Sequence, residues 1–325
     1  MTNSLSVRFL PFWEPHLQHA SSRMRAVFPV RSLCEVPGIS AGLGWCDHAD
    51  VYVVVQLCSD RTLARLEQAK RNGSTIIYCV CDRHFADGGV SVAGVQTEWR
   101  FRQLAEIAHA FIVPTTGMAE ALKPYTNERQ IFVVPDWKDY VDFEDRGLVE
   151  PSSVAAWFGN AGTGNYHAAE PYLVAAEDLG FEVRLISNAA SFGPQHRYYD
   201  RVLQWRYETF VADLRESSFS IIAFDRFERQ KSSNRLAASV MNGVPAILCG
   251  EGESAQTVLD LGFREVVVRK PFALHTAIDA VQDPIYRARY VSAAQSHFDN
   301  LLNEQNLTQK YILAINDARY KNGNT

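Results

Sequence analysis

Short runs of consecutive apolar residues, rich in β-branched side chains, alternate with segments of helical periodicity along the whole chain. In the first half these runs are "SVRFLPFW", "DVYVVVQL", "STIIYCVCD", "AFIVPT" and "QIFVVPDW". They lack the polar alternation of a strand that faces water on one side, which predicts strands buried on both faces. Strands of this kind separated by helices form a parallel sheet covered by helices on both sides. The chain is therefore predicted to have an α/β fold.

This pattern runs through the chain twice. In the first half, helices are predicted at residues 21–36, 60–72, 97–110 and 116–125, and Gly73 is expected to end the second of them. The second half has the runs "VAAWFGN", "FEVRLIS", "FSIIAFD", "VPAILCG" and "REVVVRK", with helices predicted at residues 167–179, 199–216, 234–242 and 255–261. Between the halves, "KDYVDFEDRGLVEPSS" breaks the pattern with charges, glycine and proline. We interpret this segment as a linker between domains.

The length of the chain agrees with two domains, because its 325 residues suffice for two domains of about 150 residues each. We predict two tandem Rossmann-like, doubly wound domains at residues 1–140 and 154–283. The linker is expected at residues 141–153, and a C-terminal helical segment at residues 284–325 is expected to pack back toward the first domain.

Composition excludes several classes of protein. A net charge of −5 without a basic stripe argues against nucleic-acid binding. The six cysteines show no CxxC spacing, which indicates reduced thiols in a cytoplasmic protein rather than disulfides or a zinc site. The N-terminus does not resemble a signal peptide, and no apolar run approaches the length of a bilayer span. A peripheral membrane contact stays open.

Polar clusters follow three strands of the second half, where ligands bind in open α/β sheets. "GNAGTGNYH" offers glycines that let a phosphate or sugar approach the backbone, although a plain flexible turn explains it equally well. In "KSSNRLAASVMNGVPAIL", two cations stand at a predicted helix start that a serine can cap, which suits a phosphate. In "GEGES", a carboxylate could bind a ribose or sugar hydroxyl, and capping of the next helix by Ser254 is the alternative. The candidate residues are Gly159, Asn160, Thr163, Lys231, Ser232, Ser233, Asn234, Arg235, Glu251 and Glu253.

Two clusters in the first half are also candidates. Asp82 and His84 follow the third strand, where a carboxylate and an imidazole could act as a general base or bind hydroxyls. A structural ion pair between Asp82 and Arg83 is the alternative. A second cluster at the start of the first helix, expected to serve the acceptor side or to bind phosphate, comprises Ser22, Arg23 and Arg25. "DHAD" at residues 47–50 precedes a strand and is interpreted as surface, so no metal site is predicted.

The tandem domains, with "VAAWFGN" opening the second and "KSSNRLAASVMNGVPAIL" near its end, resemble GT-B glycosyltransferases of the bacterial surface-polysaccharide type. "SSRMRAVFPVRSL" and "IIYCVCDRHF" are similar to segments of such enzymes. The resemblance implies that the second domain binds a nucleotide-sugar donor and the first a glycan or lipid-linked acceptor. It also implies transfer in the cleft between the domains, with Asp82 or His84 as catalytic residues and without a metal or other cofactor.

One feature departs from the large retaining GT-B families. They carry two glutamates eight positions apart, and this chain has Gln230 and Ala238 at the corresponding positions. Two alternatives therefore stay open beside a glycosyltransferase: a non-catalytic nucleotide- or sugar-binding protein of the same fold, and a nucleotide-sugar epimerase.

Overall fold

The chain consists of two compact units. The computed structural model describes residues 4–12, 19–86, 90–127, 129–139, 146–160, 164–188, 192, 196–225 and 229–323. The first unit comprises Met1–Trp137 together with Leu302–Thr325, and the second comprises Lys138–Leu301. The C-terminal helical segment thus contributes to both units, and each unit is described below by itself.

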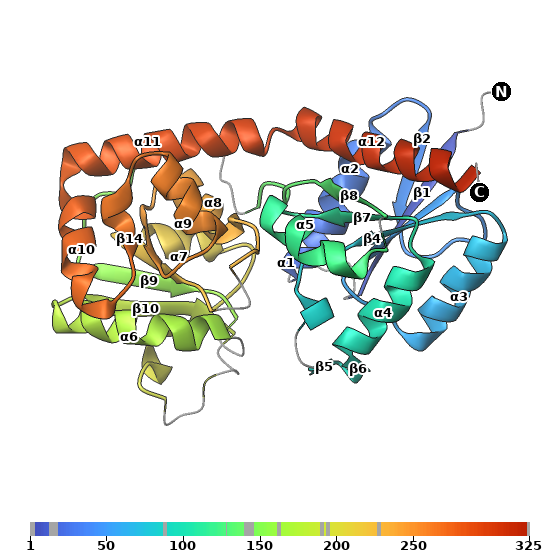
Figure 1. The fold of residues 1–325 in the computed structure, drawn as a ribbon. Coiled ribbons are helices and arrows are strands. Elements are labelled where there is room, and N and C mark those ends of the chain that lie inside the picture. The colour runs from blue at the N-terminus through green and yellow to red at the C-terminus, as the bar shows by residue number, and fades with distance from the viewer. Residues whose placement is uncertain are drawn as a thin grey trace. The chain divides into compact units, whose positions relative to one another are not determined.

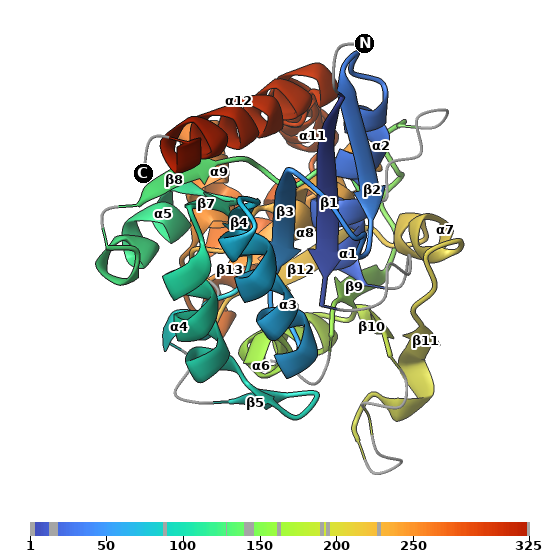
Figure 2. The same ribbon diagram turned by 90° about the vertical axis from the view of Figure 1, so that its right-hand side faces the viewer.

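A parallel sheet of six strands forms the centre of the first unit, in the order β2-β1-β3-β4-β7-β8 (Figure 2). Its strands are β1 (Leu5–Pro11), β2 (Ile39–Leu43), β3 (Val51–Val55), β4 (Thr75–Cys79), β7 (Ala110–Val113) and β8 (Gln130–Val133). All residues of β3, β4 and β7 are buried, as their continuous apolar runs predicted. The edge strand β2 was not predicted, because "ISAGL" is half-exposed and has little β-branched character. A short hairpin, β5 (Ser91–Val92) and β6 (Val95–Gln96), stands apart from the sheet.

Helices cover both faces of this first sheet. They are α1 (Ala20–Ser22), the π-helical turn η1 (Arg23–Val27), α2 (Phe28–Cys34), α3 (Asp60–Arg71), α4 (Thr97–Ile107), α5 (Thr116–Leu122) and α12 (Glu304–Gly323). The helices α3, α4 and α5 pack on one face and enclose a core that contains Leu66, Tyr78 and Phe101. On the other side, α12 packs along α2 (Figure 1). Gly73 follows α3 with a left-handed φ of +92°, which confirms it as the residue that ends this helix.

The second unit also has a parallel sheet of six strands, in the order β11-β10-β9-β12-β13-β14. Its strands are β9 (Val154–Phe158), β10 (Glu182–Ser187), β11 (Val202–Gln204), β12 (Phe219–Ala223), β13 (Ala246–Cys249) and β14 (Val267–Val268). The chain builds β10 and β11 outward on one side of β9 and then places β12 on the other side. This is the strand order of a Rossmann fold, and the order reverses between β9 and β12.

The helices of the second unit are α6 (Gly164–Asp178), α7 (Phe210–Arg215), α8 (Asn234–Met241), α9 (Glu253–Asp260), α10 (Leu274–Gln282) and α11 (Pro284–Leu301). The helices α7 and α8 share a core with the sheet residues Phe158 and Ile186. The prediction of a single helix at residues 199–216 is wrong, because this segment forms a 3₁₀ turn, the strand β11 and the helix α7. The strand β11 forms by pairing with β10, a contact that local periodicity does not encode. The helix α10 was also not predicted.

Candidate functional site

The predicted residues of the second half gather at one edge of its sheet. Gly159 and Asn160 directly follow β9, the segment 229–235 follows β12, and Glu251 and Glu253 follow β13. Because β9, β12 and β13 are adjacent parallel strands, their carboxyl ends share one edge of the sheet. This edge includes the point between β9 and β12 where the strand order reverses, which is where nucleotides bind in Rossmann folds.

The segment after β12 contacts the segment after β13 directly. The Arg229 guanidinium pairs with the Glu251 carboxylate at 3.1 Å, and the Glu253 amide donates to the Arg229 carbonyl at 3.0 Å. A Cβ atom at Gly252 would lie only 3.3 Å from the Arg229 backbone, so this approach favours glycine. Arg229 was not among the predicted residues, although it lies within the polar run after the strand.

Arg235 is anchored at the end of β12. Its Nη2 atom donates to the carbonyl of Ala223 at 3.1 Å, and its guanidinium carbon lies 5.6 Å from the centre of the Phe224 ring. The four residues Lys231, Ser232, Ser233 and Asn234 are half-buried like Arg235. The segment that opens α8 therefore presents two half-buried cations beside the positive end of the helix dipole.

Two serines considered as helix caps, Ser233 for α8 and Ser254 for α9, do not cap these helices. Ser233 occupies the N-cap position of α8, but its side chain makes no capping hydrogen bond. The N-cap of α9 is Gly252, so Ser254, the alternative cap considered for "GEGES", lies inside that helix and is buried.

Gly159 makes the turn after β9 tight. Its φ of +153° disfavours other residues, and a Cβ atom here would lie 3.3 Å from the indole ring of Trp157. The Ser187 hydroxyl donates to the Gly159 carbonyl at 2.7 Å and fixes the turn against the end of β10. Asn160, the next residue, is exposed, whereas Thr163 lies outside the described residues.

The two positions that hold glutamates in the large retaining families differ in environment. Gln230 is half-buried in the segment before α8. Ala238 is 2% exposed and belongs to the apolar core that includes Phe158 and Phe210. A carboxylate at position 238 would have to enter this core without water, which is costly.

Asp82 lies at the carboxyl edge of the first sheet, three residues after Cys79, the last residue of β4. Its Oδ2 atom accepts a hydrogen bond from the side-chain amide of Gln56 at 2.6 Å. His84 begins a 3₁₀ turn two residues later, and both side chains are half-buried. The guanidinium of Arg83 lies 5.8 Å from the Phe85 ring centre.

Ser22, Arg23 and Arg25 lie in and before the π-helical turn η1, and all three are buried. The Arg25 guanidinium forms an ion pair with Asp136 and donates to the Val134 carbonyl at 2.6 Å. Burial lowers the pKa of Arg25, but the Asp136 carboxylate together with Cys79, Tyr311 and Cys81 outweighs this effect, and the net pKa lies above the ordinary value. Single π-helical turns are rare and often occur at functional sites.

Gln56 and Asp136 were missed in the sequence. A signal was nevertheless present, because each is the polar residue next to last in a predicted run, "DVYVVVQL" and "QIFVVPDW".

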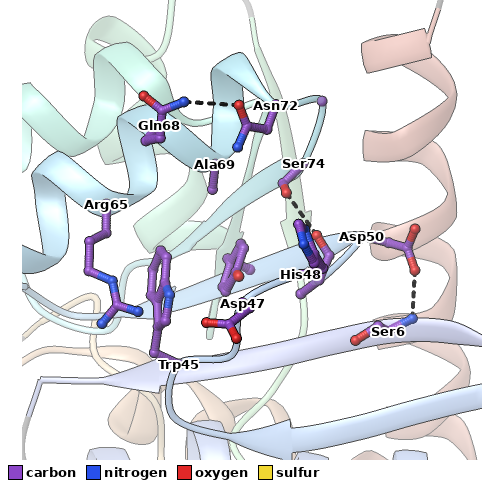
Figure 3. A pocket seen from close by; sticks show the side chains of 13 residues that line it. Ser6, Trp45, Asp47, His48, Asp50, Arg65, Gln68, Ala69, Asn72 and Ser74 are labelled. Atoms are coloured by element: carbon purple, nitrogen blue, oxygen red, sulfur yellow. Dashed lines mark hydrogen bonds between the residues drawn. The ribbon is translucent and has the colours of Figure 1, made fainter.

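A separate concavity of about 540 Å³ lies at the opposite, amino edge of the first sheet (Figure 3). It contains the "DHAD" residues, with Asp50 accepting from the Ser6 amide at 2.7 Å. Beside them the Trp45 ring stacks on Tyr52 at 4.5 Å, and the Arg65 guanidinium lies 4.1 Å over the same indole. Because it opens at the other end of the strands, this concavity is separate from the edge that carries Asp82.

Three further features bear on the site. Among the described residues, no group of three or more His, Cys, Asp or Glu side chains is placed to hold a metal ion. Within the same part of the chain, no helix combines the length and hydrophobicity that a membrane crossing requires. All six cysteines are free thiols, and Cys58, Cys79 and Cys249 are buried.

Sequence comparisons found no relative: no protein-family model and no curated protein matches this chain. Solved structures match in fold. A mutant of S. aureus TarM in complex with fondaparinux, alpha-GlcNAc-glycerol and UDP has a TM-score of 0.58 and 9% identity, covering 82% of this chain and 55% of TarM. A second TarM structure has a TM-score of 0.60 and 9% identity, and the match covers 82% of this chain and 54% of that one.

A mutant of Thermobaculum terrenum O-GlcNAc transferase matches with a TM-score of 0.59 and 12% identity, covering 99% of this chain and 68% of the other. The chain spans only 55% and 54% of the two TarM chains. These similarities concern the fold. With two parallel sheets of six strands each, the chain has the two-domain GT-B fold that the sequence resemblance implied.

Proposed function

We propose that the protein is a glycosyltransferase that moves a sugar from a nucleotide-sugar donor to a hydroxyl of a glycan or lipid-linked acceptor. One observation carries the proposal. At the carboxyl ends of β9, β12 and β13, a glycine turn, two cations and two carboxylates gather at the switch point of a Rossmann-type sheet and beside the start of α8. Such an edge suits a nucleotide diphosphate, since phosphates bind where backbone amides and helix N-termini converge.

The matched structures support the type of donor. The TarM complex contains UDP and alpha-GlcNAc-glycerol, so a protein of this fold binds a uridine nucleotide and a glycosylated alcohol. A UDP-sugar is accordingly the first donor to test, and glycerol is a suitable small acceptor.

In this proposal, Lys231 and Arg235 bind the diphosphate and stabilise the charge that develops on it as the sugar departs. The dipole of α8 adds to this stabilisation, so the proposal requires no metal or other cofactor. Gly159 lets the donor approach the backbone, and Glu251 or Glu253 binds a ribose or sugar hydroxyl. Asn160, Thr163, Ser232, Ser233 and Asn234 complete the proposed donor-binding set.

The first unit would bind the acceptor. Asp82 is proposed as the general base that accepts the proton of the attacking hydroxyl, with His84 as a second candidate. The buried ion pair of Arg25 with Asp136 would stabilise the backbone beneath this edge of the sheet. Arg23 lies in the same π-helical turn as Arg25, and Ser22 directly precedes it. The free thiols fit a reducing compartment, and we propose that the protein acts in the cytoplasm.

Binding of a donor is tested by calorimetry with UDP-N-acetylglucosamine and UDP-glucose. Lys231→Ala and Arg235→Ala each remove a charge-assisted contact of about 1.5–3 kcal/mol, so the affinity should fall about tenfold or more. Arg264→Ala is the matched control, because Arg264 is an exposed arginine that precedes β14 and lies at the opposite edge of the sheet. Equal affinities in all three variants would place the donor site elsewhere.

Turnover is tested by the release of UDP in the presence of glycerol. Asp82→Asn should leave donor affinity unchanged and lower turnover by about 10²–10⁴-fold if Asp82 is a general base. Tight donor binding without consumption would instead support a non-catalytic binding protein. Conversion of the donor to an epimer without transfer would support the epimerase alternative.

A further inference from the structure

Gln56 has an unusual backbone conformation at the edge of the first sheet. It directly follows β3 and has a φ of +69°, in the left-handed region that side chains other than glycine rarely adopt. Among the described residues, two other non-glycine residues have a positive φ, Ala93 and Asn127. Ala93 lies between the strands of the β5–β6 hairpin, where a turn accounts for it. Gln56 instead lies between neighbouring strand ends of the main sheet, and residues strained in this way concentrate at functional sites.

The neighbouring strand β4 holds the Gln56 backbone in this conformation. The Gln56 amide donates to the Cys79 carbonyl at 3.0 Å, and its carbonyl accepts from the Tyr78 hydroxyl at 2.6 Å. Tyr78 is fully buried, and burial raises the pKa of its hydroxyl well above the ordinary value, so this hydroxyl stays a donor. Both polar groups of the peptide are thus fixed by a buried strand.

The side chain of Gln56 is directed by this backbone to Asp82. Its Nε2 atom donates to Oδ2 of Asp82 at 2.6 Å. An amide donor fixes a carboxylate oxygen without neutralising its charge, unlike a lysine or arginine in the same place. This hydrogen bond, made from a backbone that β4 holds in the left-handed region, fixes the orientation of the Asp82 carboxylate.

We propose that Gln56 is the positioning residue for Asp82, holding its carboxylate in the orientation needed to accept the proton of the attacking hydroxyl. The inference rests on the proposed function, since it assigns Gln56 a role in that reaction. Tyr78 takes part indirectly, by keeping the Gln56 peptide in its left-handed conformation.

The test is a comparison of stability and turnover in Gln56→Gly. Glycine adopts a positive φ without strain, so the variant should keep or gain thermal stability while it loses the amide that holds Asp82. Turnover should fall about 10–100-fold, the size of loss found when a hydrogen-bond partner that orients a metal ligand is removed. The KM for the UDP-sugar should stay unchanged, because the proposed donor residues lie in the other unit. A merely structural residue would show the reverse, with lower stability and unaffected turnover.

Two further variants sharpen the comparison. Gln56→Asn keeps a residue that tolerates the left-handed region but withdraws the amide by one methylene group, so it should lose turnover without unfolding. Ala93→Gly is the matched control, since it relieves the same kind of backbone strain in the β5–β6 hairpin and should leave turnover unchanged.

The outcomes separate this inference from the proposed function. The measurement is UDP release from UDP-N-acetylglucosamine and UDP-glucose with glycerol. In an Asp82→Asn background, Gln56→Gly should have little further effect, because both changes act on the same group. If Asp82→Asn is inactive and Gln56→Gly is fully active, the positioning role is wrong and the proposed function stands. If the wild-type protein consumes neither UDP-sugar, the proposed function fails for these donors and the role of Gln56 fails with it.

Discussion

Substitution of Gly243 by alanine should destabilise the second unit strongly. Gly243 ends α8 within the "MNGVP" motif and has a φ of +76°. Any L-residue in this region carries strain of about 1–2 kcal/mol. A Cβ atom would also collide with the carbonyl oxygen of Gly147 and lie 2.9 Å from its carbonyl carbon and 3.2 Å from Cα of Leu148. Because these are backbone atoms, the chain at Gly147 and Leu148 has to move.

A shift of the Gly147 and Leu148 backbone would weaken several hydrogen bonds around Gly243. The Val149 amide donates to the Gly243 carbonyl at 3.1 Å. The Arg215 guanidinium donates to the Gly147 carbonyl at 3.1 Å and to the Asn242 carbonyl at 3.0 Å. Each such bond contributes about 0.5–1.5 kcal/mol to stability. With the backbone strain, Gly243→Ala should cost about 3–5 kcal/mol, near the upper end for single substitutions.

Gly262→Ala is the matched control. Gly262 follows α9 with a φ of +88°, and no atom lies within 4 Å of the position of its Cβ. This variant should show only the strain, about 1–2 kcal/mol. Urea unfolding gives the comparison, and hydrogen exchange at the Val149 amide reports on the second unit alone, since a chain of two units need not unfold in one step. Equal losses in the two variants would refute the steric argument.

Three other predictions concern charge and thiols. Arg25→Met removes the cation of the buried Arg25–Asp136 ion pair and should cost about 3–5 kcal/mol in urea unfolding, whereas Arg25→Met with Asp136→Asn should recover part of the loss. Burial, with the charge of Lys70, lowers the pKa of His109 from 6.5 to about 4. Between these pH values the unfolded chain binds more protons, so stability should fall as pH falls through this range, and His109→Gln should flatten the curve. Burial raises the pKa of Cys58 to about 11, so alkylation at pH 8 followed by mass spectrometry should find the exposed Cys34 modified first, and equal rates would contradict the burial of Cys58.

The sequence by itself determined the fold class and most of its elements. Strands β3, β4 and β7 are buried on both faces, and a strand buried in this way is recognisable in the sequence as a continuous apolar run. Helix ends are local as well, because a residue such as Gly73 ends a helix through its own backbone freedom. The positions of Asp82 and of the segment that opens α8 at the carboxyl edges of their sheets were also predictable. Both follow predicted strands, and all carboxyl ends of a parallel sheet lie at one edge.

Only the tertiary structure decided features that depend on partners distant in the sequence. Residues 202–204 form the strand β11 because they pair with the edge strand β10. Their sequence pattern by itself fits a helix equally well. Arg25 was a candidate for ligand binding in the sequence. In the structure it is buried and forms an ion pair with Asp136, which follows β8, the last strand of the first sheet along the chain. Gln56 and Asp82 come together only because β3 and β4 are neighbours in register. Local pattern specifies which residues are buried, whereas the pairing of strands decides which polar groups meet.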